Sequence, residues 1–102
     1  MNSRYNDEAA EEAIEVARNL ELCGETLGDR FLDALRSCVD EIEKNPRLYP
    51  RDTSAGRGSD IRSRSVERFA YSVIYEVLAD ELVILAIKHH KRRAGYWKHR
   101  RG

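Results

Sequence analysis

The feature that most constrains this chain is a pair of apolar runs between Val66 and Lys88, separated by a short polar break. In the first run, aromatic and β-branched residues recur at a period of two, which is typical of a half-buried strand. Its apolar side consists of Phe69, Tyr71, Val73, Tyr75 and Val77. The second run, residues 82–87, is apolar on both sides, as expected of a central strand. The intervening Ala79-Asp80-Glu81 predicts that the two runs form an antiparallel hairpin.

Two amphipathic helices are predicted upstream of this hairpin, with Gly24 ending the first of them. An asparagine and an aspartate at positions 6–7 can cap the first helix, and the second is expected to begin within residues 26–28. Asn45-Pro46 should end the second helix, because the residue before a proline avoids the α region. The apolar stripes are Ala9, Ala13, Val16, Ala17 and Leu20 in the first helix and Phe31, Leu35, Cys38, Val39 and Ile42 in the second.

Three further segments complete the predicted fold. Residues 46–60 contain both prolines together with glycine and serine, and are expected to form a loop. Residues 61–68 are predicted to form a third antiparallel strand, and residues 1–5 an edge strand. The order β-α-α-β-β-β, with helices covering the one apolar face of a small antiparallel sheet, predicts an α+β two-layer sandwich. Residues 1–102 are expected to be a single domain.

Composition limits the class of protein. The chain is 41% hydrophobic and 35% charged, which is typical of a globular domain. No apolar run approaches the roughly 18 residues of a membrane span, and the N-terminal residues do not resemble a signal peptide. Cys23 and Cys38 lack a CxxC partner, so we expect buried or half-buried thiols in a reducing cytoplasm.

The net charge of zero conceals an asymmetry between the two halves of the chain. Residues 1–50 carry twelve acidic and six basic residues, and residues 51–102 carry six acidic and twelve basic residues. A small domain with an acidic helical half and a basic half suggests two different partners.

Neither a metal site nor a hydrolytic site is predicted. His89 and His90 are adjacent, so on a strand they point to opposite faces, and His99 lies among cations that would repel a metal ion. The chain has no G-x-S-x-G motif, and neither cysteine has a positioned histidine nearby in sequence. We expect no cofactor.

The basic residues near the C-terminus are more informative. Arg62, Arg64 and Arg68 alternate along the third predicted strand and are expected to share one face. Seven further cations follow the last strand, with Tyr96 and Trp97 among them. This combination suits RNA or single-stranded DNA, an acidic protein partner, or a solubilising tail whose Trp97 packs back on the core.

At these residues the chain resembles a known family. The run FAYSVIYEVLADELVILAIKHHKRRAGYW is similar to the C-terminal half of the RelE/ParE superfamily of bacterial type II toxins. Residues 8–46 resemble the helical hairpin of that superfamily, with Arg30-Phe31 opening the second helix. The resemblance covers nearly the whole chain and implies the same order of elements.

The superfamily includes two activities, because RelE-like members cleave mRNA in the ribosome whereas ParE-like members inhibit DNA gyrase. In mRNA-cleaving relatives an arginine commonly follows the first tyrosine of this strand, and here that position is Ser72. Phosphate-binding lysines of the preceding strand are replaced by Ser63-Arg64-Ser65. The resemblance therefore favours a ParE-like, plasmid-stabilisation type of toxin that arrests growth by binding gyrase and has no catalytic residues.

Two alternatives stay open. The first is a metal-independent, ribosome-dependent endoribonuclease that uses Arg64, Arg93 and Tyr96. The second is a family member without toxicity that only binds an antitoxin.

The resemblance also implies a cognate antitoxin that wraps the toxin, and hence a toxin–antitoxin hetero-oligomer. The residues expected to bind the target or the antitoxin are Arg62, Arg64, Arg68, His90, Arg92, Arg93, Tyr96, Trp97 and Arg100.

Overall fold

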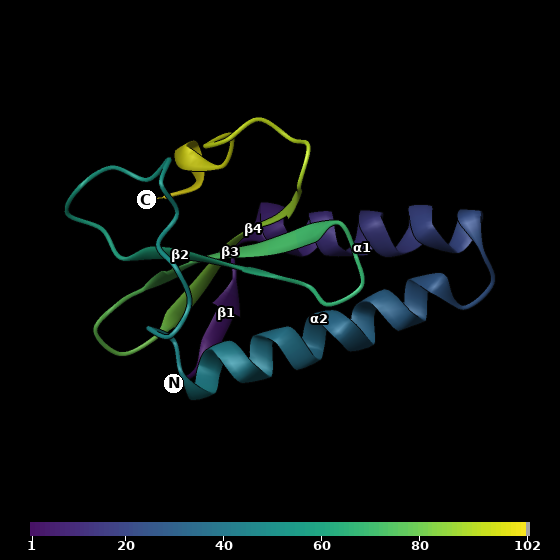
Figure 1. Cartoon of the computed structure of the whole chain (residues 1–102), viewed down its shortest axis with the longest axis horizontal. Helices are drawn as coiled ribbons and strands as arrows, with labels where there is room; N and C mark the ends of the chain where they lie inside the picture. Colours follow the sequence, from purple (N-terminus) through teal and green to yellow (C-terminus); the bar gives the residue numbers. More distant parts are fainter. Residues whose placement is uncertain (102) are drawn as a thin grey trace.

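The chain follows the predicted order of elements, with two helices between the first and second strands of one sheet (Figure 1). The structure is a computed structural model that describes residues 1–101. Its elements are β1 (Ser3–Tyr5), α1 (Asp7–Cys23), α2 (Leu27–Lys44), β2 (Ile61–Ser65), β3 (Tyr71–Val77), β4 (Leu82–His89) and a short 3-10 helix, η1 (Lys98–Arg100). The predicted α+β sandwich is confirmed.

The sheet has the strand order β1-β4-β3-β2, so the apolar run of residues 82–87 lies in a central strand as predicted. β2, β3 and β4 are antiparallel, whereas β1 pairs with β4 in parallel, so the sheet is mixed rather than purely antiparallel. The α1–α2 hairpin carries the chain from β1 at one edge of the sheet to β2 at the other edge. β4 therefore lies between β1 and β3, and it pairs with β1 in parallel and with β3 antiparallel.

The helical hairpin begins and ends at the residues expected from the sequence. Asn6 caps α1 by accepting a hydrogen bond from the Glu8 backbone N–H, and Gly24 ends this helix. The Glu21 carboxylate caps α2, because it accepts hydrogen bonds from the backbone N–H groups of Thr26 and Gly28. Thr26 has a positive φ of 67° and makes no side-chain cap of its own.

The third predicted strand is shorter than expected. β2 ends at Ser65, and the Val66 N–H donates to the Tyr71 carbonyl across a turn in which Arg68 has a φ of 70°. Arg68 therefore lies in this turn and does not continue the alternation of Arg62 and Arg64. Phe69 also lies in the turn and packs edge-to-face on Phe31, with ring centroids 5.3 Å apart.

Both faces of the sheet are apolar, and this differs from the single apolar face expected from the sequence. The first cluster lies between the sheet and the helices and includes Ala9, Ala13, Ala17, Phe31, Leu35, Val39, Ile42, Val73, Tyr75 and Ile84. The second lies on the opposite face and consists of Ile61, Ile74, Val83, Leu85, Ala86 and Trp97. The C-terminal segment covers this second cluster, because it folds back over the sheet after β4 (Figure 1).

The two cysteines differ in their surroundings. Cys38 is buried, and burial raises the pKa of its thiol to about 11. Cys23 is exposed at the end of α1, so the expectation of a buried or half-buried thiol is wrong for this residue. Within residues 1–101, no helix combines the length and the apolar character that crossing a membrane requires.

Candidate functional site

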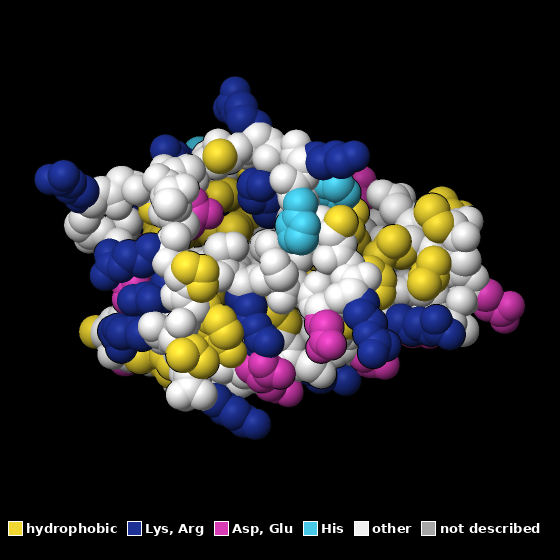
Figure 2. Space-filling model, viewed as in Figure 1, with side chains coloured by type: hydrophobic (Ala, Val, Ile, Leu, Met, Phe, Trp, Pro, Cys, Tyr) yellow, Lys and Arg dark blue, Asp and Glu magenta, His cyan; other side chains and the backbone are white. Residues whose placement is uncertain are grey.

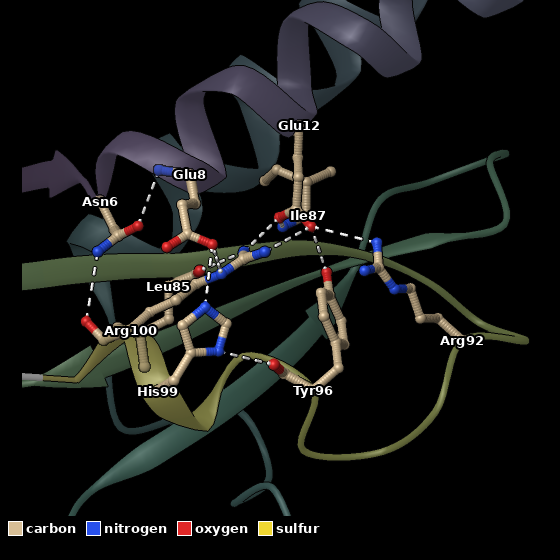
Figure 3. Close-up of polar contacts among 9 residues, drawn as sticks. All are labelled: Asn6, Glu8, Glu12, Leu85, Ile87, Arg92, Tyr96, His99 and Arg100. Carbon is tan, nitrogen blue, oxygen red and sulfur yellow. Dashed lines mark hydrogen bonds and ion pairs between the residues drawn. The ribbon is translucent and has the colours of Figure 1, made fainter.

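The C-terminal segment, residues 90–101, is held against α1 and β4 by a largely buried carboxylate. Glu12 accepts hydrogen bonds from the Tyr96 hydroxyl at 2.7 Å and from the Ile87 backbone N–H at 3.0 Å (Figure 3). It also binds Arg100 in a bidentate pair, with N–O distances of 2.7 and 3.1 Å. The Glu12 side chain is 15% exposed and that of Arg100 is 5% exposed, so this pair is largely removed from water.

These contacts close an open stretch of the β4 edge. β1 covers β4 only as far as Ile84, and a bulge at Leu85 shifts the register against β3. The Leu85 carbonyl then accepts a hydrogen bond from Arg100, and the Ile87 N–H donates to Glu12. Side chains thus replace the missing neighbouring strand, which protects an edge that could otherwise pair with another chain.

Two cations and an aromatic ring surround the same carboxylate. The guanidinium of Arg92 lies 3.8 Å from the centre of the Tyr96 ring and 3.6 Å from the Glu12 carboxylate. Burial and the hydrogen bond to Glu12 raise the pKa of Tyr96 well above its usual value. Next to this group, Glu8 pairs with Arg100 and His99, and the hydrogen bond from His99 holds the pKa of Glu8 below its usual range (Figure 3).

Four of the predicted site residues therefore have contacts within the fold. Trp97 is fully buried in the second apolar cluster, so its indole is not presented on the surface of the free chain. Arg92, Tyr96 and Arg100 all face Glu12. Trp97 therefore packs back on the core, which was one of the possibilities for this segment.

The two arginines of β2 lie at the other edge of the sheet. Arg62 donates to Asp60 and to the carbonyls of residues 47 and 49. Arg64 pairs with Glu41 of α2 and stacks on Tyr49, with its guanidinium 4.7 Å from the ring centre. Arg62 is therefore held by the 46–60 loop and Arg64 by α2, whereas Arg92 and Arg100 lie beside α1.

A third group of predicted residues is exposed. Arg68, His90 and Arg93 are all on the surface, and within residues 1–101 none of them forms an ion pair with a carboxylate. His90 Nε2 lies 3.0 Å from the Ser72 hydroxyl. Figure 2 shows cationic side chains projecting from the part of the molecule formed by the 46–60 loop and the C-terminal segment.

Comparison with known proteins decides the family. A model of the family described as the ParE toxin of the type II toxin–antitoxin system, parDE, matches residues 4–94. The chain belongs to the ParE toxin family. No sequence among the curated proteins matches it.

A solved structure shows the same fold as this ParE-like toxin. It is a chromosomal ParDE TA system from P. aeruginosa, with a TM-score of 0.62 and 18% sequence identity. The match covers 87% of this chain and 95% of the other. The family match of this ParE-like chain ends at residue 94, so Tyr96 and Arg100, which hold the C-terminal segment on Glu12, lie outside it.

The three residues of the nuclease alternative are not brought together in this ParE-like chain. Arg64 lies on β2, whereas Tyr96 reaches Glu12 beside β4, and β3 separates these two strands. Arg93 is exposed in the loop that precedes Tyr96. Arg64 and Tyr96 therefore do not share a cavity in which a phosphate could contact both.

Sequence reasoning missed the two acidic residues that organise the C-terminal segment. Glu8 and Glu12 are not among the site residues predicted from the sequence. The available signal was their spacing of four residues, which places both carboxylates on one side of a helix. Within residues 1–101, no three His, Cys, Asp or Glu side chains are arranged to hold a metal ion.

Proposed function

We propose that this ParE-family toxin arrests growth by binding DNA gyrase, and that a cognate antitoxin silences it. The observation that carries the proposal is Ser72, which occupies the position where mRNA-cleaving relatives commonly have an arginine. Its hydroxyl contacts His90 and Ser65 and carries no charge. A positioned cation stabilises a transition state by about 3 kcal/mol or more, and a serine hydroxyl cannot replace it.

The surroundings of Tyr96 and Arg64 also support a toxin that acts by binding. A tyrosine that serves as a general base needs a pKa lowered towards neutrality, whereas the pKa of Tyr96 is raised. Arg64 is held by Glu41 and Tyr49. The raised pKa therefore does not suit Tyr96 for the role of a general base.

Exposed cations of the C-terminal segment are the proposed contact with gyrase. Lys91, Arg93 and Lys98 project into solvent, and within residues 1–101 no carboxylate pairs with them. Cations of this kind steer an encounter with an acidic surface and contribute at the rim of an interface. Because gyrase acts on the chromosome, this toxin would act in the cytoplasm.

The antitoxin proposal rests on the family and on the solved ParDE TA system that shares this fold. An acidic chain that folds on binding could cover the exposed cations and form a hetero-oligomer with the toxin. Its gene is expected next to that of the toxin.

Induced expression and purified gyrase together test the proposal. We expect filamentous cells, a DNA-damage response and inhibition of gyrase supercoiling in vitro. The Arg93→Glu variant should inhibit gyrase more weakly than the parent. Co-expression of the protein encoded by the neighbouring gene should restore growth. Codon-phased cuts in mRNA by primer extension, with supercoiling unaffected, would instead establish the nuclease, and harmless expression would indicate a module that only binds antitoxin.

A further inference from the structure

The face of the sheet that lies away from the helices changes from apolar to polar near the end of β4. Side chains of the second apolar cluster fill most of this face. Beyond them, three polar side chains form one row across three strands, because Ser65 pairs with Ser72 and Ser72 pairs with Lys88. Residues directly opposite one another in a sheet point to the same face. The hydroxyl oxygens of Ser65 and Ser72 lie 3.4 Å apart, which agrees with this register.

A pocket of about 300 Å³ lies over this polar end of the sheet. Polar side chains of three strands line its floor, namely Ser63, Ser72 and Lys88. Its walls come from residues 51–54 of the loop and from Ala94 of the C-terminal segment. The loop and the C-terminal segment rise on the same side of the sheet, so the pocket opens between them (Figure 1).

Lys88 brings a positive charge into this pocket without an anion to balance it. The residue is partly buried, and no carboxylate within residues 1–101 forms an ion pair with it. Its ammonium donates to the His89 carbonyl at 3.4 Å, which is a long hydrogen bond. An ammonium group has three donors, so two of them are left for a ligand. A partly buried cation of this kind is stabilised by a bound anion.

Hydroxyl groups on the floor of the pocket add hydrogen-bond donors beside Lys88. Ser63 and Ser72 both line it, and Ser72 is a buried polar residue that is 9% exposed. The Ser72 hydroxyl lies 3.0 Å from His90 Nε2. When Nε2 is the donor of this hydrogen bond, the hydroxyl hydrogen of Ser72 is available to a ligand oxygen.

The charge of the pocket lining is positive. Arg51 is exposed, and its guanidinium is 3.9 Å from the carboxylate of Asp60, so this ion pair is loose. Among the described residues that line the pocket, Asp52 is the one acid. Its carboxylate already accepts hydrogen bonds from the backbone N–H and the hydroxyl of Ser54, and this fixes the loop. Lys88 and Arg51 therefore outnumber the acid.

These groups match the oxygens of a phosphate. Proteins contact DNA phosphates with lysine, arginine and serine side chains, which are the donors found here. A phosphate presents its oxygens tetrahedrally, so Lys88 and Ser72 can contact it from the floor and Arg51 from the wall. The loop and the C-terminal segment also carry the exposed cations visible in Figure 2. Such a surround favours a long polyanion over a free phosphate.

We propose that this pocket binds a phosphate group of the DNA on which gyrase acts. Lys88 is the ionic contact, Ser72 donates a hydroxyl hydrogen bond, and Arg51 covers the phosphate from the loop. The contact is one of binding without cleavage, because Ser72 cannot supply the charge that cleavage requires. This inference rests on the proposed function, since it takes gyrase as the source of the DNA.

Titration of the full-length, isotope-labelled toxin with a short DNA duplex, followed by NMR, tests the pocket. The backbone amide resonances of Ser63, Ser72 and Lys88 should shift as the duplex is added. Lys88→Gln should weaken binding about fivefold or more, and should lower the slope of log Kd against log salt by about one, because one phosphate contact is lost.

Lys44→Gln is the matched control. Lys44 is an exposed lysine at the end of α2, and no carboxylate within residues 1–101 forms an ion pair with it. The same change of charge at this position should alter the DNA affinity less than about twofold, because salt screens a distant charge. In the supercoiling assay, Lys88→Gln should inhibit gyrase several-fold more weakly than Lys44→Gln, with both variants melting at the temperature of the parent.

The outcomes separate the pocket from the proposed function. Equal DNA affinities for Lys88→Gln and Lys44→Gln, or resonance shifts confined to residues outside the pocket, would overturn the pocket and leave gyrase inhibition intact. Shifts produced by inorganic phosphate but not by the duplex, or tighter binding of an RNA of the same sequence, would overturn DNA as the ligand. A wild-type toxin that binds DNA through Lys88 but does not inhibit gyrase would overturn the proposed function and gyrase as the source of the DNA, while supporting the phosphate site.

Discussion

Glu12 and Arg100 lie 88 residues apart in sequence and form a bidentate ion pair that fastens the end of the chain to the first helix. Both side chains are mostly buried, so each charge depends on the other for compensation. The Glu12 carboxylate also accepts hydrogen bonds from the Ile87 N–H and the Tyr96 hydroxyl. The Arg100 guanidinium also donates to the Leu85 carbonyl. The pair therefore couples α1, β4 and the C-terminal segment.

Arg100→Ala should lower the free energy of unfolding by about 3 kcal/mol, because it leaves the Glu12 carboxylate buried with only part of its compensation. Urea denaturation followed by circular dichroism measures the loss. The control is Arg4→Ala, which removes an exposed ion pair with Glu81 and should cost under about 1 kcal/mol. Equal effects of the two substitutions would contradict a stabilising role for the buried pair.

Trp97→Ala should cost about 3–5 kcal/mol, because the indole is fully buried at the centre of the second apolar cluster. Trp97→Phe should cost much less, since the indole N–H makes no hydrogen bond that the substitution would break. Trp97 is the only tryptophan in the chain, so its fluorescence reports on this site alone. We expect blue-shifted emission that iodide does not quench; a quenched, red-shifted spectrum would place the indole in water.

Arg92 and Arg93 are neighbours in sequence and are expected to respond differently to charge reversal. Arg93→Glu alters an exposed side chain and should change stability by less than about 0.5 kcal/mol. Arg92→Glu would place a carboxylate beside Glu12 and remove the contact with the Tyr96 ring, at a cost of about 1–3 kcal/mol.

Only the Arg93 variant separates target binding from folding. Its inhibition of gyrase should fall several-fold while its melting temperature stays that of the parent. Full inhibition by Arg93→Glu would remove Arg93 from the proposed contact surface.

Cys23 and Cys38 should react with thiol reagents at different rates. In the native protein at pH 8, Ellman's reagent should modify Cys23 at once, and Cys38 only after denaturation. The pKa of Cys38 is raised to about 11 by burial, so the folded state holds its proton more tightly than the unfolded state. The contribution of the protonated Cys38 thiol to the free energy of unfolding is therefore complete below pH 9 and is lost as the pH rises from about 9 to 11.

A Cys38→Ala variant isolates this pH dependence. It should show a smaller fall in the free energy of unfolding between pH 9 and pH 11 than the parent does. An identical fall in both proteins would mean that Cys38 does not contribute to it.

Gly28→Ala should destabilise the helical hairpin by about 1–3 kcal/mol. A Cβ at this position would lie 2.5 Å from the Ala17 carbonyl oxygen, so α1 and α2 would have to move apart. Gly56→Ala is the matched control, because a Cβ there would meet no atom within 4 Å. Thermal melting of the two variants measures the difference, and an unchanged melting temperature for Gly28→Ala would show that the helices can adjust.

Much of the fold could be predicted because it depends on local patterns. The alternation of apolar residues in Tyr71–Val77 and the spacing of Phe31, Leu35 and Ile42 were confirmed as the buried sides of β3 and α2. Gly24 and Asn45-Pro46 end the helices as predicted. Such features require only the period of a strand or helix and the backbone preferences of single residues.

The sequence by itself therefore determined the order of the elements, the faces of the helices and the central place of β4. Only the tertiary structure decided that β1 pairs in parallel, that Arg68 turns away from β2 and that Trp97 covers a second apolar face. It also decided that Glu12 is buried against Arg100. The physical reason is that an acidic residue in the first turns of a helix fits the same local pattern whether water or a distant arginine compensates its charge. That choice depends on where a segment nearly ninety residues away comes to lie.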